Sequence, residues 1–137
     1  MLKHYLLTLL LILPTLASAE LVIVTGSQSS IASLTDNEAR QLFSGQLRNI
    51  GGQRIQPLDL PANDANRAHF YRSLTGRSPE QMRAYWTRLI FTGQGQPPRE
   101  VSGHLELTSL VSSSPEYIGY FPASEVNDRV RVIYRIK

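Results

Sequence analysis

The sequence predicts an α/β fold with a mixed, mostly parallel sheet and helices on both faces. Three observations support this prediction. Apolar runs of strand length occur near the start and the end of the folded region, amphipathic helical patterns separate them, and glycine or proline residues mark the boundaries. Strands that alternate with helices favour a parallel or mixed sheet that is covered on both faces.

The first 19 residues have the pattern of a signal peptide. A short basic start around Lys3 precedes the apolar run Leu6–Leu13, and Ala17-Ser18-Ala19 forms a small-residue cleavage site. The apolar run is too short to span a bilayer. We therefore expect residues 1–19 to be removed and residues 20–137 to fold in the periplasm without membrane insertion. An uncleaved anchor is the alternative.

Composition excludes several classes of function. The 137-residue chain has a formal net charge of +3, spread without a basic run, which together with export argues against a nucleic-acid partner. The sequence contains no cysteine, so disulfides, thiol chemistry and thiolate metal sites are excluded. The length remaining after cleavage suits one ordinary domain with a modest core.

The elements of the first half follow from apolar periodicity and capping residues. Leu21–Val24 is a continuous apolar run that indicates a buried strand. Thr35 and Glu38 have the spacing of a capping box, which predicts a short helix after them. Arg54–Asp59 is the next strand candidate, and the helix that follows it should stop at Gly76.

The second half contains the strongest helix signal. Ser78 and Gln81 have capping-box spacing around a proline, and the helix after them carries an apolar stripe that we expect in the core. The stripe consists of Met82, Tyr85, Trp86, Leu89 and Ile90. Ser102 can cap another short helix, and Tyr117–Phe121 and Val130–Ile136 should close the chain as strands.

Several short segments carry a resemblance to a known family. Leu34–Gly45 is similar to an "LT…QL..IF.G" segment, Ile118-Gly119-Tyr120 to an "aIGY" strand, and Tyr85-Trp86 followed by Phe91-Thr92-Gly93 to a segment of short relatives. Their order and spacing resemble periplasmic phosphate-binding proteins of ABC transporters. The resemblance implies a type II periplasmic binding-protein fold, which normally holds an oxyanion between two hinged lobes. Since this chain is about half that size, it implies a single lobe.

The candidate ligand site lies where a strand runs into a helix, between Asp59 and Phe70. This junction falls where the family carries its R-x-D-G-S-G-T phosphate motif, and none of the motif residues is retained by identity. A helix start presents free backbone N–H groups and the positive end of the helix dipole, which suit phosphate or carboxylate. The candidate ligand-binding residues are Asn63, Asp64, Ala65, Asn66 and Arg67, with Thr25, Ser27 and Ser29 on a neighbouring strand-end loop.

Asp64 opposes anion binding at this junction because it is itself an anion. Two like charges about 4 Å apart repel by roughly 4 kcal/mol at an effective dielectric constant of about 20, which corresponds to nearly three orders of magnitude in affinity. Arg67 could offset part of this repulsion if its side chain folds back towards the cap. The alternative is that Asn63 or Asp64 simply caps its own helix.

Two functional hypotheses from different classes follow. The first is an exported solute-binding protein that captures phosphate or another small oxyanion for ABC-type uptake. The second is a ligand-free interaction module for an envelope transporter, sensor or assembly complex. The loop from Thr92 to Glu100 is a candidate functional loop because Gly93 and Gly95 allow motion and Arg99 is a free cation.

Neither an enzyme nor a metalloprotein is expected. The sequence lacks a G-x-S-x-G nucleophile elbow, and Asp36 and Glu38 belong to a capped helix start. His69 and His104 are far apart, with no carboxylate at ligand spacing, so each is expected to be a surface or partly buried histidine. We therefore predict no catalytic residues, no metal and no cofactor.

Overall fold

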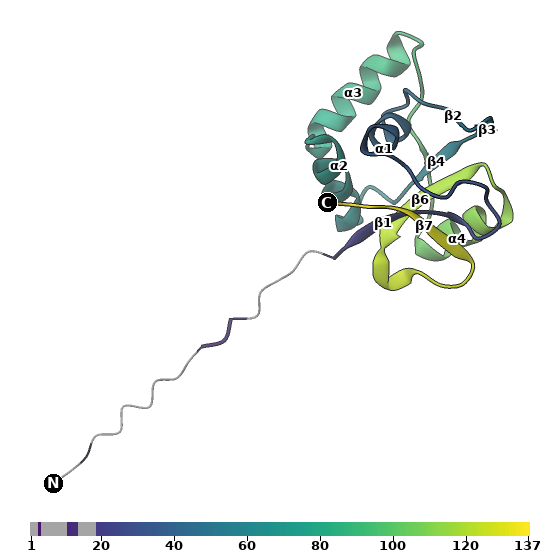
Figure 1. The fold of residues 1–137 in the computed structure, drawn as a ribbon. Coiled ribbons are helices and arrows are strands. Elements are labelled where there is room, and N and C mark those ends of the chain that lie inside the picture. The colour runs from purple at the N-terminus through teal and green to yellow at the C-terminus, as the bar shows by residue number, and fades with distance from the viewer. Residues whose placement is uncertain (1–2, 4–10, 14–18) are drawn as a thin grey trace.

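The computed structural model describes residues 3, 11–13 and 19–137, and these form a five-stranded sheet, a two-stranded hairpin and four α-helices (Figure 1). Most of the predicted signal peptide lies outside the described residues, so it stays a prediction. The elements are β1 Leu21–Gly26, α1 Asp36–Phe43, β2 Asn49–Ile50, β3 Gln53–Arg54, β4 Gln56–Asp59, α2 Ala65–Thr75, α3 Pro79–Phe91, β5 Arg99–Glu100, α4 His104–Ser113, β6 Tyr117–Pro122, the 3₁₀ turn η1 Ala123–Glu125 and β7 Val130–Arg135.

The sheet is mixed and mostly parallel, as predicted. Its strand order is β5-β4-β6-β1-β7. The strand β4 runs parallel to both β5 and β6, whereas β1 runs antiparallel to its neighbours β6 and β7. Four strands therefore point in one direction and β1 points in the other. As a result, the carboxyl end of β1 lies at the opposite edge of the sheet from the carboxyl end of β4.

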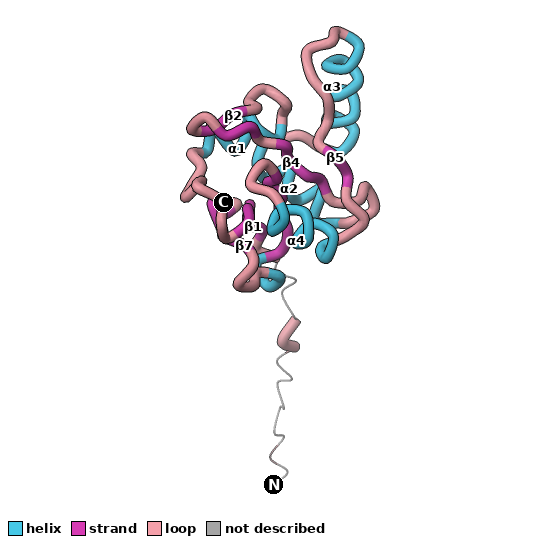
Figure 2. The backbone as a smooth tube through the Cα atoms, turned by 90° about the vertical axis from the view of Figure 1, so that its right-hand side faces the viewer, coloured by secondary structure: helices cyan, strands magenta, loops and turns pink. Residues whose placement is uncertain are grey.

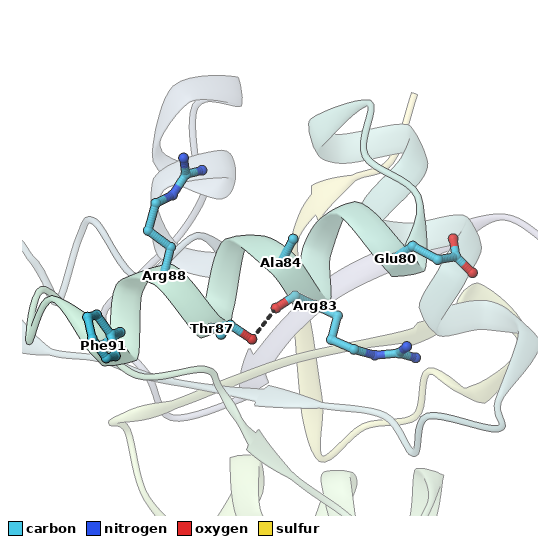
Figure 3. A pocket seen from close by; sticks show the side chains of 6 residues that line it. All are labelled: Glu80, Arg83, Ala84, Thr87, Arg88 and Phe91. Carbon is cyan, nitrogen blue, oxygen red and sulfur yellow. Dashed lines mark hydrogen bonds between the residues drawn. The ribbon is translucent and has the colours of Figure 1, made fainter.

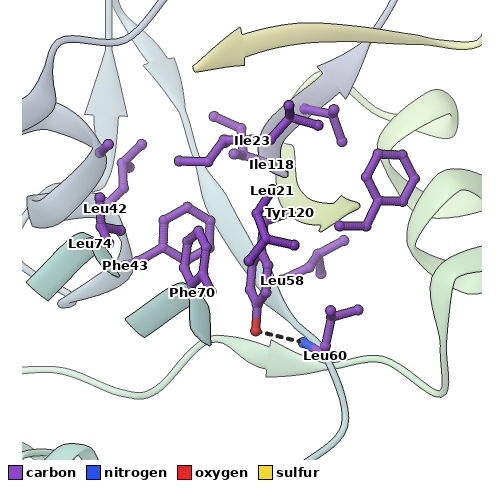
Figure 4. Close-up of a cluster of buried hydrophobic side chains, with 14 of the residues drawn as sticks. Leu21, Ile23, Leu42, Phe43, Leu58, Leu60, Phe70, Leu74, Ile118 and Tyr120 are labelled. Carbon is purple, nitrogen blue, oxygen red and sulfur yellow. Dashed lines mark hydrogen bonds between the residues drawn. The ribbon is translucent and has the colours of Figure 1, made fainter. Parts of the chain in front are cut away.

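Helices cover both faces of this sheet, and strand β6 shows how. The ring of Tyr120 stacks on Phe70 of α2, with a centroid distance of 3.6 Å, and meets Phe43 of α1 edge-on (Figure 4). On the opposite face, a side chain added at Gly119 would collide with Leu107 of α4. Because successive strand residues point to opposite faces, α1 and α2 cover one face and α4 the other.

The helix starts confirm two of the three predicted caps. Thr35 caps α1 and Ser78 caps α3, each with the full capping box. The prediction that Ser102 caps α4 is wrong, because α4 begins after Gly103. The hydroxyl and backbone N–H of Ser102 instead donate to the carboxylate of Glu106.

The far end of α3 extends beyond the body of the molecule (Figure 2). Met82, Tyr85 and Trp86 are buried as predicted, but Ile90 is 55% exposed and Phe91 is 91% exposed. Placing Ile90 in the core was therefore wrong, because the last turn of α3 passes beyond the elements that cover its earlier turns. Among the described residues, no helix is long and apolar enough to cross a membrane.

The hairpin β2–β3 was not predicted. Its turn is formed by Gly51 and Gly52, which both have positive φ angles, of 56° and 82°. Such angles suit a two-residue hairpin turn and are readily adopted by glycine. The Gly-Gly pair was a local signal for this turn, but the flanking strands have only two residues each and show no periodicity.

Candidate functional site

Asp64 occupies the start of α2 and caps the helix. Its Oδ1 accepts a hydrogen bond of 2.9 Å from the backbone N–H of Asn66. Its Oδ2 lies 3.2 Å from Nε2 of His104, the first residue of α4. The structure therefore shows the capping alternative, with both carboxylate oxygens engaged by the chain itself.

Arg67 folds back towards the end of β4 and faces carboxylates of the chain. Its Nη1 donates to the carbonyl oxygen of Leu60 at 2.9 Å. Its Nε lies 3.5 Å from Oδ2 of Asp59, and Nη1 lies 3.5 Å from Oε2 of Glu100. The other oxygen of Glu100 accepts from the backbone N–H of Ala62 at 3.2 Å. The cation of the candidate site is thus already neutralised.

Asp59 anchors this network from inside the core, where it is 2% exposed. It accepts hydrogen bonds from the hydroxyls of Tyr71, at 2.8 Å, and Tyr120. Burial raises the pKa of Asp59, while the charge of Arg67 and the two tyrosine hydrogen bonds oppose that rise. Burial, together with the Asp59 charge, also raises the pKa values of Tyr71 and Tyr120 above the ordinary tyrosine value, so both hydroxyls stay protonated donors.

His104 links three segments at this edge of the sheet. Besides the contact with Asp64, its Nδ1 lies 3.6 Å from Oε1 of Glu125 in η1, and its side chain is 26% exposed. The prediction of a partly buried histidine is confirmed. Within residues 19–137, His, Asp and Glu side chains form no group of three that could hold a metal ion.

Thr25, Ser27 and Ser29 lie at the opposite edge of the sheet, so the expectation that their strand-end loop lies next to the start of α2 is wrong. The cause is the reversed direction of β1, in which Thr25 is paired with Arg131 near the start of β7. The Thr25 hydroxyl donates to the carbonyl of Tyr117, and the Arg131 guanidinium donates to the carbonyls of Ser27 and Ser29. Whether these residues bind a ligand there stays a prediction.

The remaining predicted residues do lie together at the start of α2. Asn63 and Ala65 are exposed, and Asn66 is half-buried. Glu100 and His104 were missed as partners of this site. Each is about 40 residues away along the chain from the group it contacts, and no local pattern reports such a contact. The arrangement has the shape of an anion site, but its donors are bound by carboxylates of the same chain.

The hollows of the lobe lie mainly beside α3. One, of about 590 Å³, follows its outer side and is lined by Glu80, Arg83, Ala84, Thr87, Arg88 and Phe91 (Figure 3). A smaller groove of about 300 Å³ separates α2 from α3 and is lined mostly by apolar side chains, among them Tyr71, Met82, Trp86 and Ile90. Glu80 is among the residues that line the first hollow, and Arg67, which lines the second, is paired with Asp59 and Glu100.

The fold matches solved structures of phosphate transport proteins. An ABC-type phosphate transport receptor from Vibrio cholerae superposes with a TM-score of 0.66 and 20% identity, covering 84% of this chain and 45% of that one. A putative phosphate ABC transporter substrate-binding protein from Clostridium perfringens, solved with bound phosphate, gives 0.65 and 18%, covering 84% and 44%. PstS from Borrelia burgdorferi gives 0.63 and 14%, covering 85% and 47%.

The chain has the fold of one lobe of these substrate-binding proteins. It spans less than half of their length, and no model of a known protein family matches its sequence. These structural neighbours are transport proteins rather than enzymes. At this level of identity the likeness establishes the fold, and function must be argued from the side chains of the lobe itself.

Proposed function

We propose that this chain is an exported, single-lobe protein of the substrate-binding fold that works in the cell envelope as an interaction module for a transporter, sensor or assembly complex. One observation carries the proposal. The N–H groups of Ala62 and Asn66 and the guanidinium of Arg67 are bound by Glu100, Asp64 and Asp59. The proposal assigns the chain no catalytic activity.

A phosphate at the start of α2 would have to replace these internal contacts. At about 4 Å from a carboxylate it would meet a repulsion of roughly 4 kcal/mol at an effective dielectric constant of about 20. Here Glu100 accepts from the N–H of Ala62, and Asp64 accepts from the N–H of Asn66. The loss would exceed two orders of magnitude in affinity. This energetic cost supports the proposal that the lobe does not capture phosphate at the start of α2.

Oxyanion capture for ABC-type uptake is the second candidate, and one observation favours it. The similar protein from Clostridium perfringens holds a bound phosphate, and Arg67 supplies a cation at the junction in this chain. Binding in this case would require Asp64 to leave its capping position or a second chain to complete the site.

Thermal unfolding with orthophosphate separates the two candidates. We expect millimolar phosphate to leave the melting temperature of the parent protein unchanged, because a ligand that does not bind contributes no stabilisation. If Asp64 excludes the anion, phosphate should raise the melting temperature of Asp64→Ser, because the bound ligand stabilises the folded state by RT ln(1 + [L]/Kd). Asn63→Ser, a change at an exposed neighbour, should show no such rise. A phosphate-dependent rise in the parent's melting temperature would favour oxyanion capture.

Export is part of the proposal and has its own test. We propose that residues 1–19 are removed and that residues 20–137 form the periplasmic domain. The intact mass of the protein recovered from a periplasmic fraction should correspond to a chain that begins at Glu20. A mass that includes residues 1–19, or recovery only from membranes, would contradict cleavage at this position.

Cross-linking in intact envelopes tests the interaction module and should yield one defined partner species.

A further inference from the structure

We propose that a groove between the hairpin β2–β3 and the segment after α3 binds a small soluble oxyanion that carries several negative charges. The groove has a volume of about 610 Å³. Arg48 and Arg54, from the two arms of the hairpin, and Arg99, from β5, line it together with Gln56 and Gln96. We call it the arginine groove. None of its lining residues belongs to the network at the start of α2, so the inference does not depend on the proposed function.

Backbone contacts fix the positions from which the three arginines project. The N–H of Ile55 donates to the carbonyl oxygen of Arg48 at 2.7 Å, and Arg54 pairs with Asn49 across the hairpin. Arg99 lies opposite Leu58 in the parallel pair of β4 and β5. These contacts fix the backbone of the three lining residues, while their long side chains are exposed and can adjust to a ligand.

The arginine groove is not neutralised by the chain. No aspartate or glutamate is among the described residues that line it, and none of its three arginines makes an ion pair within residues 19–137. Two carboxylates lie close to the groove. Glu116 accepts from the side chain of Gln56, which lines it. Hydrogen bonds from Ser102 lower the pKa of Glu106, and the charge of Arg99 adds a smaller contribution. Glu100, next to Arg99 on an edge strand, binds Arg67 and the amide of Ala62.

This charge distribution indicates an anionic ligand. Cations gathered around one hollow repel each other, and a bound anion relieves that repulsion. The start of α2 shows the opposite case, since Arg67 faces two carboxylates there. Guanidinium groups bind phosphate and carboxylate oxygens through paired, charge-assisted hydrogen bonds. The arginine groove therefore has anion-binding capacity that the chain does not use.

The size of the groove favours an anion larger than orthophosphate. A water molecule takes about 30 Å³ in the liquid, so a hollow of about 610 Å³ has room for roughly twenty such volumes. Three arginines arranged around that space suit a molecule with two or more separated charged groups. Inorganic tripolyphosphate has this chemistry and serves as the probe.

The glycines after α3 shape the wall of this groove. Gly93 has a φ of 69° and ends the helix, and Gly95 is buried, where an added side chain would press on Leu89. The chain then turns back towards β5 (Figure 2). Gln96 and Pro98 line the groove. The loop from Thr92 to Glu100, singled out in the sequence for its mobility, is in this view a fixed boundary of a binding site.

Isothermal titration calorimetry with tripolyphosphate tests the proposal. We expect saturable 1:1 binding of tripolyphosphate and no measurable binding of orthophosphate at millimolar concentration. Since a hydrogen bond to a charged group contributes about 1.5–3 kcal/mol, Arg54→Gln and Arg99→Gln should each weaken tripolyphosphate about tenfold or more. The control is Arg88→Gln, on α3 outside the groove, which should bind as the parent does. Unchanged melting temperatures confirm that the variants fold.

Several results would overturn the arginine groove as a multivalent oxyanion site. They are the absence of saturable binding, equal affinity for orthophosphate and tripolyphosphate, or an equal loss in Arg88→Gln and Arg54→Gln, which would indicate a general charge effect. The variant Asp64→Ser should leave tripolyphosphate binding unchanged, because Asp64 is not among the residues that line the groove. A change in that variant would place the anion at the start of α2 instead.

Discussion

The residues at the start of α2 form a closed set of charges centred on Asp59. This carboxylate lies in the core, is bound by two tyrosine hydroxyls and faces Arg67. Arg67 in turn faces Glu100, and Asp64 caps the helix beside them. A buried charge is tolerated when its hydrogen bonds and its counter-charge are supplied together. The site is therefore organised for stability, with each donor already assigned to an acceptor.

Replacing Asp59 should show this structural role. Asp59→Ala leaves the hydroxyls of Tyr71 and Tyr120 without their acceptor and removes a counter-charge of Arg67. We expect a loss of about 3 kcal/mol in the free energy of unfolding. Urea denaturation measures it as a lower midpoint at an unchanged slope. A loss below about 1 kcal/mol would show that the network contributes little.

The pH dependence of stability gives a second test of Asp59. Burial raises its pKa above the ordinary value of 3.8, so the folded state favours the protonated acid. The contribution of Asp59 to the free energy of unfolding is therefore fully present when the pH is below its pKa in the unfolded chain. It is lost as the pH rises through its pKa in the folded protein.

Comparison with Asp59→Asn isolates this effect, because asparagine does not ionise. As pH rises from about 4 towards neutrality, the parent should lose stability relative to the variant. The measurement is urea denaturation of both proteins at several pH values. A difference between them that does not depend on pH, or that favours the parent as pH rises, would contradict the pKa direction of Asp59.

At the scale of elements, local signals predicted much of the fold but not the direction of one strand. Capping boxes at Thr35 and Ser78 located α1 and α3, and apolar runs located β1, β6 and β7. Whether β1 runs with or against its neighbours depends on its place in the sheet, which no short pattern encodes. The direction of β1 determined which predicted residues share the candidate site, because it placed Ser27 and Ser29 at the edge of the sheet opposite the start of α2.

The close contact of β1 with α4 is testable through Gly26. A side chain at this position would overlap the backbone carbonyl oxygen of Val111, whereas one at Gly103 would meet nothing within 4 Å. Because backbone cannot move aside cheaply, Gly26→Ala should cost about 1–3 kcal/mol of unfolding free energy. Gly103→Ala, at a helix cap, should cost less than about 1 kcal/mol. Equal costs in urea denaturation would mean that this packing is loose.

At the scale of the whole molecule, the lobe separates two electrostatic environments. The edge at the carboxyl end of β4 holds the neutralised network around α2, and the region near the starts of β4 and β5 holds the unpaired arginines of the arginine groove. The first was partly visible in the sequence, since Asp64 stood at a helix start. The second was not, because three arginines spread from residue 48 to residue 99 converge only in the folded chain.

The central claim is that the start of α2 does not take phosphate because the chain's own carboxylates occupy its donors. An NMR titration of the ¹⁵N-labelled protein with orthophosphate tests it most directly, using the amides of Ala62 and Asn66, which donate to Glu100 and Asp64. We predict that neither amide resonance moves up to millimolar phosphate. A saturable shift of both resonances with one common Kd would contradict the claim.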